Sequence, residues 1–226
     1  MLAKALVIRL ISVSMALVGS QSFASGEISQ VTVEGLHLVK DTELALVYAE
    51  PGVDLRQYHR INLAPAYIAF KKNWKRNQNQ TDPHKIESSD MDKMKVELAE
   101  LFRVVFSETL EQGGYELVTE RAEDVLLIRP AIINLDVISP DTTMSTAANV
   151  HSYAETVGEM TLYLELYDSL TDDIIAKALD PKEDRRTGYF LWQNRVTNRA
   201  AANRILKVWA NVLKQGLDEA SAVNGN

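Results

Sequence analysis

The chain holds 226 residues, with 31 acidic side chains against 24 basic ones and a formal net charge of −7. This balance argues against nucleic acid as a partner, because phosphate binding needs a basic surface. The chain has no cysteine, which excludes disulfides, cysteine-ligated metals and a cysteine nucleophile.

The first 24 residues have the three parts of a cleavable export signal. Lys4 and Arg9 supply positive charge, residues 10–18 form a short, mostly apolar stretch, and Ser22-Phe23-Ala24 offers the small residues that a signal peptidase selects. The apolar stretch is shorter than the roughly 20 residues that span a bilayer. We therefore expect cleavage after Ala24 and a soluble periplasmic or secreted product with no transmembrane anchor. Because a bacterial lipid anchor needs a cysteine, we also expect a product that is not lipidated.

The rest of the chain is long enough for one core and favours one domain over two. We expect a lead-in at residues 25–43, a single domain at 44–220 and a flexible tail at 221–226. Residues 44–49 predict a first strand.

A second strand is predicted over residues 60–70, where Pro65 indicates a sheet edge or a bulge. Residues 71–87 are polar and predict an irregular connection. A long helix should then begin at Ser88 or Ser89, whose side chain can accept from unpaired N–H groups of the first turn. It should end at Gly113-Gly114, which suits a left-handed cap. Its apolar residues recur at three- and four-residue steps: Met94, Leu98, Leu101, Phe102, Val105, Phe106, Thr109 and Leu110.

Strands are predicted again after this helix. Residues 115–118 form a short one and residues 125–137 a long one, with a bulge or bend at Pro130. Residues 139–158 are polar and predict a long loop.

Residues 161–168 alternate between apolar and polar side chains, which is typical of a half-buried antiparallel strand. Tyr163 and Tyr167 lie on the face opposite the leucines, where they either line a binding surface or cover the sheet. Residues 174–179 return as the hairpin partner. The leucines are Leu162, Leu164 and Leu166.

A second long helix, capped by Asn198, closes the chain. The resulting order predicts an α+β fold: a single sheet of about five to six mostly antiparallel strands, with both helices packed on one face. The buried stripe of this helix is predicted to be Ala202, Ile205, Leu206, Trp209, Val212, Leu213, Leu217 and Ala220, and Val208 flanks it.

Several short motifs, in this order, resemble the bacterial family of proteins of unknown function numbered 3313. The resemblance covers nearly the whole chain after the signal. The motifs are Glu34-Gly35-Leu36, Val47-Tyr48, Pro51-Gly52-Val53-Asp54-Leu55 with Tyr58, Gly113-Gly114-Tyr115 with Val118, Glu165 to Thr171 with Ile175-Ala176, and Asp184-Arg185-Arg186.

The chain departs from the family pattern in two places. The hairpin usually turns through Thr-Gly-Glu, whereas Thr171 is followed here by Asp172-Asp173. Many members are described as lipoproteins, yet this chain lacks the lipid-bearing cysteine. The resemblance implies an exported protein and carries no established activity.

One basic-aromatic run stands out in this acidic chain. Lys71, Lys72, Lys75 and Arg76 surround Trp74. The indole could stack and the cations could neutralise charge on an anionic polymer or a lipid headgroup surface. The alternative is a solvated segment whose tryptophan packs back on the core.

A second charged group surrounds the later hairpin. Paired carboxylates can perform acid–base chemistry or hold calcium, but Asp168 before Ser169 also fits an ordinary turn. Arg185 and Arg186 could grip a carboxylate or phosphate, or form surface ion pairs with acidic neighbours. The acidic residues are Asp168, Asp172, Asp173, Asp180, Glu183 and Asp184.

The four histidines, His37, His59, His84 and His151, have no spacing that joins two of them at a metal. The sequence has no nucleophile elbow, P-loop or dinucleotide motif, so we expect no metal and no cofactor. We therefore predict a non-catalytic module that binds an envelope protein or an anionic envelope component. The alternative is a hydrolase of an envelope polymer that uses Asp168 or Asp184.

Overall fold

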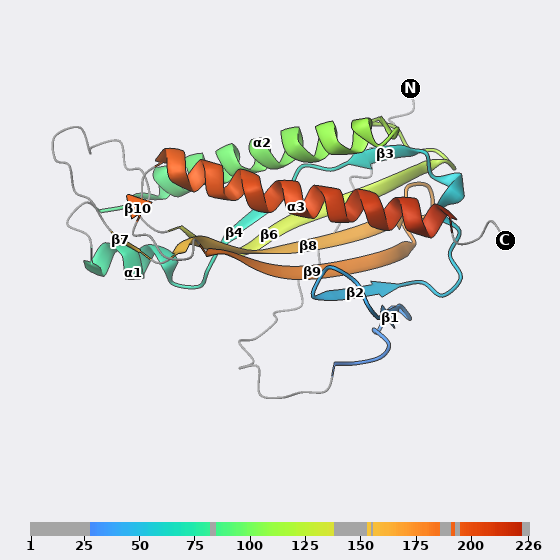
Figure 1. Ribbon diagram of the computed structural model, residues 1–226, viewed down its shortest axis with the longest axis horizontal. Helices are drawn as coiled ribbons and strands as arrows, with labels where there is room; N and C mark the ends of the chain where they lie inside the picture. Colours follow the sequence, from blue (N-terminus) through green and yellow to red (C-terminus); the bar gives the residue numbers. More distant parts are fainter. Residues whose placement is uncertain are drawn as a thin grey trace, which may run out of the picture.

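The computed structural model describes residues 28–81, 85–137, 153–154, 156–185, 191–192 and 195–222. The export signal at 1–24 and most of the predicted loop at 139–158 therefore lie outside the described residues. The described chain has an α+β fold with one mixed eight-stranded sheet (Figure 1). The expected fold class is confirmed, while the expected sheet was too small and too uniformly antiparallel.

The sheet has the strand order β1-β2-β9-β8-β6-β3-β5, and β4 also pairs with β6. Pairs from β1 to β6 along this order are antiparallel, whereas β3 and β4 run parallel to β6 and β5 runs parallel to β3. A separate two-stranded ladder joins β7 (Tyr153–Ala154) to β10 (Leu191–Trp192). The strands of the main sheet are β1 (His37–Val39), β2 (Leu46–Ala49), β3 (Arg60–Leu63), β4 (Tyr67–Phe70), β5 (Glu116–Leu117), β6 (Val125–Val137), β8 (Thr156–Asp168) and β9 (Ile174–Arg185).

The segment 60–70, predicted as one strand, forms two. β3 ends at Leu63 and β4 begins at Tyr67, with Pro65 between them. Both strands lie along β6, and Ala64 N–H donates to the Ile128 carbonyl at 2.9 Å. Proline has no N–H to donate to a strand ladder. Pro65 therefore separates two strands and does not form a bulge within one continuous strand.

The bulge in β6 lies at Asn134 and not at Pro130 as predicted. Pro130 pairs in regular register with Leu164, and the register shifts between Ile133 and Asp136, where Asn134 has φ of 54°. Backbone groups of a strand alternate sides, so the Pro130 nitrogen points to the same side as Ile128. On that side, β3 has ended and β4 has not yet begun, so the missing N–H of Pro130 removes no hydrogen bond from a strand ladder.

The β8–β9 hairpin is longer than the sequence predicted. β8 begins at Thr156, inside the stretch expected to be a loop, and β9 continues past Leu179 to Arg185. The predicted alternation is confirmed, because the three leucines of β8 are buried. A sheet strand also begins within the expected lead-in, since β1 starts at His37.

Three α-helices and one short 3-10 helix complete the described chain. The stretch at 71–87, predicted to be irregular, contains α1 (Trp74–Thr81). The other helices are η1 (Leu55–Gln57), α2 (Ser88–Gln112) and α3 (Arg195–Ala222).

The predicted end of α2 is confirmed and its predicted cap is wrong. Glu87 is the N-cap and forms a capping box with Asp90, whose carboxylate accepts from Glu87 N–H at 2.9 Å. Gly114 follows the helix with φ of 91°, the left-handed conformation that glycine tolerates. α3 begins at Arg195, so Asn198 is inside the helix and does not cap it.

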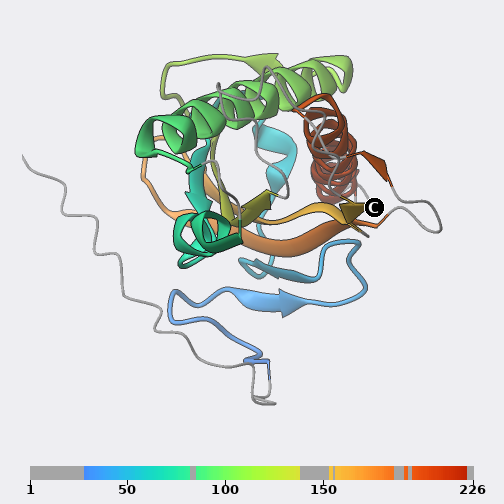
Figure 2. The ribbon, with the colours of Figure 1, turned by 90° about the vertical axis from the view of Figure 1, so that its left-hand side faces the viewer.

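Both long helices cover one face of the sheet, as predicted (Figure 2). Phe102 and Phe106 of α2 stack with ring centroids 3.8 Å apart, and Trp209 of α3 is fully buried. These rings close the core over the leucines of β8 and over Ile128 and Ile132 of β6. Burial of this apolar face is the main source of stability in a chain without disulfides.

One carboxylate lies inside this core. Asp180 of β9 is only 2 % exposed. It accepts from Ala45 N–H at 2.9 Å and from the Trp209 indole N–H at 2.7 Å, and Lys182 lies 3.2 Å away. The sequence grouped Asp180 with the other acidic residues around the later hairpin, but its partners show that it joins β9, α3 and the segment before β2.

Candidate functional site

The basic-aromatic run lies at the start of α1, and its tryptophan is part of the core. Trp74 is 3 % exposed, stacks on Phe70 at 4.3 Å and donates to the Val137 carbonyl at 3.2 Å. Trp74 therefore packs back on the core, which was the second interpretation of the run that the sequence allowed. The indole fixes α1 to the ends of β4 and β6 and offers no open face for stacking on a ligand.

The cations of the run have different surroundings. Lys71 forms ion pairs with Asp136, at 3.2 Å, and with Glu159, so it joins β4, β6 and β8. Lys75 donates to Ser88 Oγ at 3.0 Å, which ties α1 to the first residue of α2. Lys72 and Arg76 are exposed. Lys71 is exposed too, and Lys72 also has an interaction within the protein. Any binding role of the run therefore rests on the exposure of Lys72 and Arg76 and not on their lacking partners.

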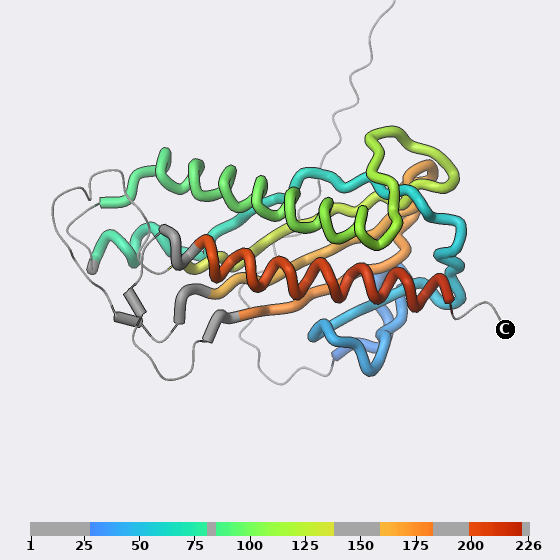
Figure 3. Tube along the Cα trace, turned by 45° about the horizontal axis from the view of Figure 1, so that its top comes forward, coloured from blue at the N-terminus to red at the C-terminus, as the bar shows by residue number. Residues whose placement is uncertain are grey.

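The two long helices run parallel and both begin at the α1 end of the molecule (Figures 1 and 3). A helix carries partial positive charge at its N-terminus and partial negative charge at its C-terminus. The α1 end thus combines two helix N-termini with the lysines and arginine of the run. Arg199 and Lys85 are exposed there too.

The opposite end of the molecule is acidic. No basic residue lies in the last turn of α2 or of α3, where cations would normally stabilise a helix. The acidic side chains of the helix ends, of the connection before β6 and of the hairpin turn are Glu108, Glu111, Glu116, Glu120, Glu123, Asp124, Asp168, Asp172, Asp173, Asp218 and Glu219.

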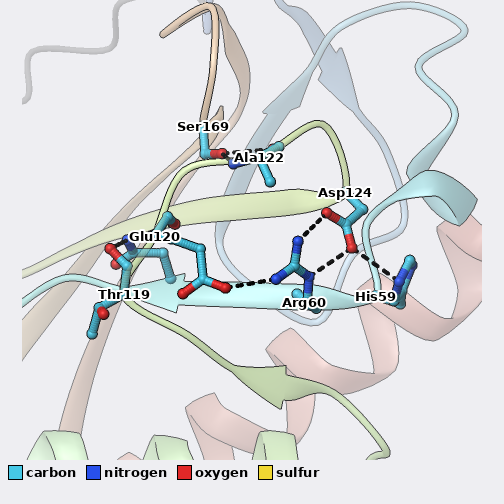
Figure 4. A network of polar contacts seen from close by, with 8 residues as sticks. His59, Arg60, Thr119, Glu120, Ala122, Asp124 and Ser169 are labelled. Atoms are coloured by element: carbon cyan, nitrogen blue, oxygen red, sulfur yellow. Dashed lines mark hydrogen bonds and ion pairs between the residues drawn. The ribbon is translucent and has the colours of Figure 1, made fainter.

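A compact ion-pair network occupies this acidic end (Figure 4). Arg60 of β3 donates to both oxygens of Asp124, at 2.6 and 2.5 Å, and to Glu120 at 2.6 Å. His59 Nε2 lies 3.0 Å from Asp124. The Arg60 guanidinium lowers the pKa of Asp124 to about 2. Arg60 thereby fixes β3 to the connection that leads into β6.

The two carboxylates predicted for catalysis, Asp168 and Asp184, lie at opposite ends of the later hairpin. The Asp168 carboxylate accepts from Leu170 N–H, Thr171 N–H and the Tyr58 hydroxyl, which confirms its role in the turn. Burial opposes its ionisation, yet these bonds together lower the pKa of Asp168. Asp184 lies near the far end of β9, about 35 Å from the turn at 3.3 Å per residue. Acid and base of a glycosidase lie within about 10 Å, so these two residues cannot act on one bond.

The two arginines predicted as an anion fork fall at the limit of the described chain. Arg185 is the last residue of β9 and pairs with Thr156 in β8. The strand ends there on the α1 side of the sheet. Arg186 lies outside the described residues.

A second candidate surface is the sheet face opposite the helices, which we call the outer face. Tyr163 and Tyr167 donate to the two oxygens of Glu165, at 2.6 and 2.7 Å. Burial and then this bond raise the pKa of both hydroxyls, for Tyr167 to about 12. Arg129 lies 4.5 Å from the Tyr167 ring centroid, as a cation–π pair. The sequence named the tyrosines but missed Arg129, which the Arg129–Glu165 register brings beside them.

Two general properties follow from the described residues. Within them, no group of three or more histidine, aspartate or glutamate side chains is placed to hold a metal ion. None of the helices described here contains an apolar stretch long enough to cross a bilayer.

Comparison with solved structures gives distant similarities, three of which follow. PelC of Paraburkholderia phytofirmans, a dodecamer, has a TM-score of 0.37 at 11 % identity, covering 74 % of this chain and 94 % of that one. A family DUF330 protein of Xanthomonas campestris gives 0.41 at 10 %, covering 76 % and 93 %. A DUF4136 protein of Bacteroides thetaiotaomicron gives 0.37 at 12 %, covering 77 % and 95 %. Scores this low support no inference about function.

Sequence comparison is more specific. No curated protein matches the chain significantly. The sequence model of the family described as "Protein of unknown function (DUF3313)" matches residues 34–213. This match spans most of the chain, including the motifs noted in the sequence, and the protein therefore belongs to the DUF3313 family.

Proposed function

We propose that the protein is a non-catalytic binding module of the bacterial envelope. After export and cleavage at Ala24, it docks with its α1 end onto an anionic envelope component. The observation that carries this proposal is the separation of charge along the molecule. The cations of the run and both helix N-termini lie at one end, together with the carboxylates of Glu87, Asp90, Asp136 and Glu159. Eleven acidic side chains lie around the other end, and four of them are paired with Arg60, Arg121 or Lys214.

This arrangement gives an acidic protein a defined way to approach an anionic surface. After cleavage the chain lacks Lys4 and Arg9, so 22 basic side chains remain against 31 acidic ones. The resulting formal charge of −9 repels such a surface, but a molecule with a cationic end is turned so that this end faces it. The positive dipole end of α3 adds to the attraction, whereas the N-terminus of α2 is already capped by Glu87 and Asp90. Arg185, at the α1 end of β9, belongs to the same docking surface, and we extend this to Arg186 from its sequence position.

The roles within the run are not equal. Lys72 and Arg76 contact the anionic component, whereas Trp74 and Lys71 position α1. Replacing Trp74 would disturb the fold, because its ring fills the core. Lys71 is already paired with Asp136 and Glu159 at the surface, so its charge contributes less to an external contact. The informative substitutions are therefore at the exposed cations.

The test compares the mature chain with the double variant Lys72→Glu, Arg76→Glu in co-sedimentation with envelope fractions. We expect the wild type to bind at low salt, with binding that weakens as salt screens the charges, and the variant to lose at least tenfold in affinity. Vesicles of phosphatidylglycerol, with phosphatidylcholine vesicles for comparison, separate a lipid headgroup from an anionic polymer as the source of binding.

A matched control reverses the same amount of charge elsewhere. Arg103 of α2 and Lys207 of α3 are exposed, and Arg103→Glu, Lys207→Glu should bind like the wild type. Equal binding by the wild type and the Lys72, Arg76 variant would refute docking through the α1 end. Equal loss in both double variants would show that only net charge matters.

A further inference from the structure

The exposed side of α1 carries side-chain amides besides its cations. Asn73, which directly precedes the helix, is exposed, and so are Arg76, Asn77 and Gln80. These residues follow one another at positions i, i+3, i+4 and i+7, the spacing that places side chains on one face of a helix. No acidic residue occurs within residues 71–81. The face therefore combines positive charge with neutral hydrogen-bonding groups.

The opposite side of α1 is fixed to the rest of the fold. Trp74 and Gln78 both donate to the Val137 carbonyl, at 3.2 and 3.3 Å. The Asn79 side chain accepts from Ile86 N–H at 2.7 Å and donates to the Ile86 carbonyl at 3.1 Å. Because a helix this short is not stable alone, these bonds hold its exposed face in one arrangement before a ligand binds. Such preorganisation lowers the entropic cost of binding.

This face is poorly suited to a lipid bilayer. A helix that lies on a membrane buries apolar side chains such as tryptophan, phenylalanine and leucine in it. The large apolar side chain of α1 is Trp74, which is turned into the core, and no exposed large hydrophobic side chain lies within residues 71–81. Attraction by charge alone takes clusters of about four to eight cations, and Lys71 and Lys75 are already held by partners within the protein.

The same face suits a chain that is rich in hydroxyl groups. A side-chain amide both donates and accepts hydrogen bonds, as a sugar hydroxyl does. The amides of Asn73 and Gln80 have no hydrogen bond of their own within the part of the chain that the structure describes. A guanidinium such as that of Arg76 binds a carboxylate or phosphate through two parallel N–H bonds. Asn73 and Gln80 lie about 10 Å apart along the helix, a length that covers more than one sugar residue.

From these observations we infer that the anionic envelope component bound by the α1 end is an acidic polysaccharide, with Asn73 and Gln80 as specificity-determining residues. This rests on the proposed docking through the α1 end and names the chemistry of the partner. The cations attract the carboxylate or phosphate groups of the polysaccharide. The amides distinguish it from an anionic polymer without hydroxyl groups, which leaves their hydrogen bonds unmade.

The test compares the binding of three anionic probes by the mature chain at the same low salt concentration, using isothermal titration calorimetry. Alginate carries carboxylates and sugar hydroxyls, polyacrylate carries carboxylates without hydroxyls, and vesicles of phosphatidylglycerol present a lipid surface. At equal carboxylate concentration, we expect the wild type to bind alginate about tenfold more tightly than polyacrylate, because the amides add hydrogen bonds to the attraction of charge. Binding to the vesicles should be weaker than binding to alginate.

The double variant Asn73→Gly, Gln80→Ala removes both amides and no charge. Asn73 has φ of 63°, a conformation that glycine tolerates, and alanine favours a helix, so the melting temperature should not change. Affinity for alginate should fall about tenfold, while affinity for polyacrylate should stay the same. The matched control is Asn211→Ala, Gln215→Ala, which removes two exposed amides of α3 and should bind alginate like the wild type.

Equal affinity of the wild type for alginate and polyacrylate would overturn the inference. So would an amide variant that binds alginate as tightly as the wild type does. Tighter binding to the vesicles than to alginate would identify a lipid headgroup as the partner. In these cases a loss of binding in Lys72→Glu, Arg76→Glu still supports docking through the α1 end, so the two proposals fail separately. A chain that binds none of the three probes would contradict both.

Discussion

The two faces of strand β8 meet different environments within a few residues of each other. Leu162, Leu164 and Leu166 are buried beneath the helices, and the apolar area they bury stabilises the fold. Tyr163, Glu165 and Tyr167 bond to one another on the outer face. The comparison shows that one strand can supply stability with one face and a preorganised polar surface with the other.

The sharpest test of this difference uses two adjacent residues. Leu164→Ala leaves a cavity in the core and should lower the free energy of unfolding by about 3 kcal/mol. Glu165→Gln keeps the shape of the side chain and should cost less than about 1 kcal/mol, because the outer-face network keeps water within reach. Urea denaturation followed by circular dichroism measures both.

Similar losses in the two variants would contradict the comparison, since they would give the outer face a structural role equal to that of the core. Ile133→Ala is a useful third variant. Ile133 is apolar but lies on the outer face, so its truncation should cost less than that of Leu164.

Asp180 is the exception on the core face, and it supplies the next largest expected effect. Its two oxygens each accept from a different N–H, that of Ala45 and that of the Trp209 indole. Asp180→Asn turns one acceptor into a donor and leaves one N–H unpaired, which should cost about 2 kcal/mol. Urea denaturation again gives the measurement.

Lys182→Gln is the control for charge at this site. It removes the ion pair but leaves both hydrogen bonds of Asp180, and Lys182 is partly exposed, so its effect should be smaller. An Asp180→Asn variant as stable as the wild type would show that the buried carboxylate is not needed to join α3 to the sheet.

Sequence patterns predicted the parts of the fold that repeat locally. The apolar stripes of α2 and α3 extend over many turns, and the alternation in β8 extends over eight residues, so each pattern could be recognised without knowing its partner. Gly113-Gly114 correctly predicted where α2 ends. These elements were enough to predict both helices on one face of a sheet.

The features that the sequence did not predict depend on contacts between distant segments of the chain. Nothing local shows that β3 and β4 both run beside β6, or that β9 continues as a strand through its polar residues 180–185. α1 has too few apolar residues to show a stripe, and Trp74 alone marks its buried side. Asp180 was grouped with the acidic residues around the hairpin because its partners Ala45 and Trp209 are far away in sequence.

The smallest expected effect is a difference in the pH dependence of stability between the acidic end of the molecule and the apolar core. Arg60 and Asp124 lie at the acidic end, and the arginine lowers the pKa of Asp124 from 3.8 to about 2. A carboxyl whose pKa is lower in the folded state stabilises the protein above the unfolded pKa. This contribution is present at neutral pH and is lost as the pH falls from about 4 to about 2. The Leu164 side chain carries no titrating group, so the free energy that its own burial contributes should not change in this range.

The melting temperature of Asp124→Asn and of the wild type, measured from pH 5 to pH 2, tests this difference. The variant should be less stable at pH 5, and the two curves should converge towards pH 2, because protonation removes the same interaction that the substitution removes. Asp92→Asn, on the exposed side of α2, serves as the control and should run parallel to the wild type. Curves for Asp124→Asn that stay equally far from the wild type at every pH would mean that the Arg60–Asp124 pair does not titrate in this range. The acid sensitivity would then have to come from elsewhere, and the assignment of pH-dependent stability to this end of the molecule would be wrong.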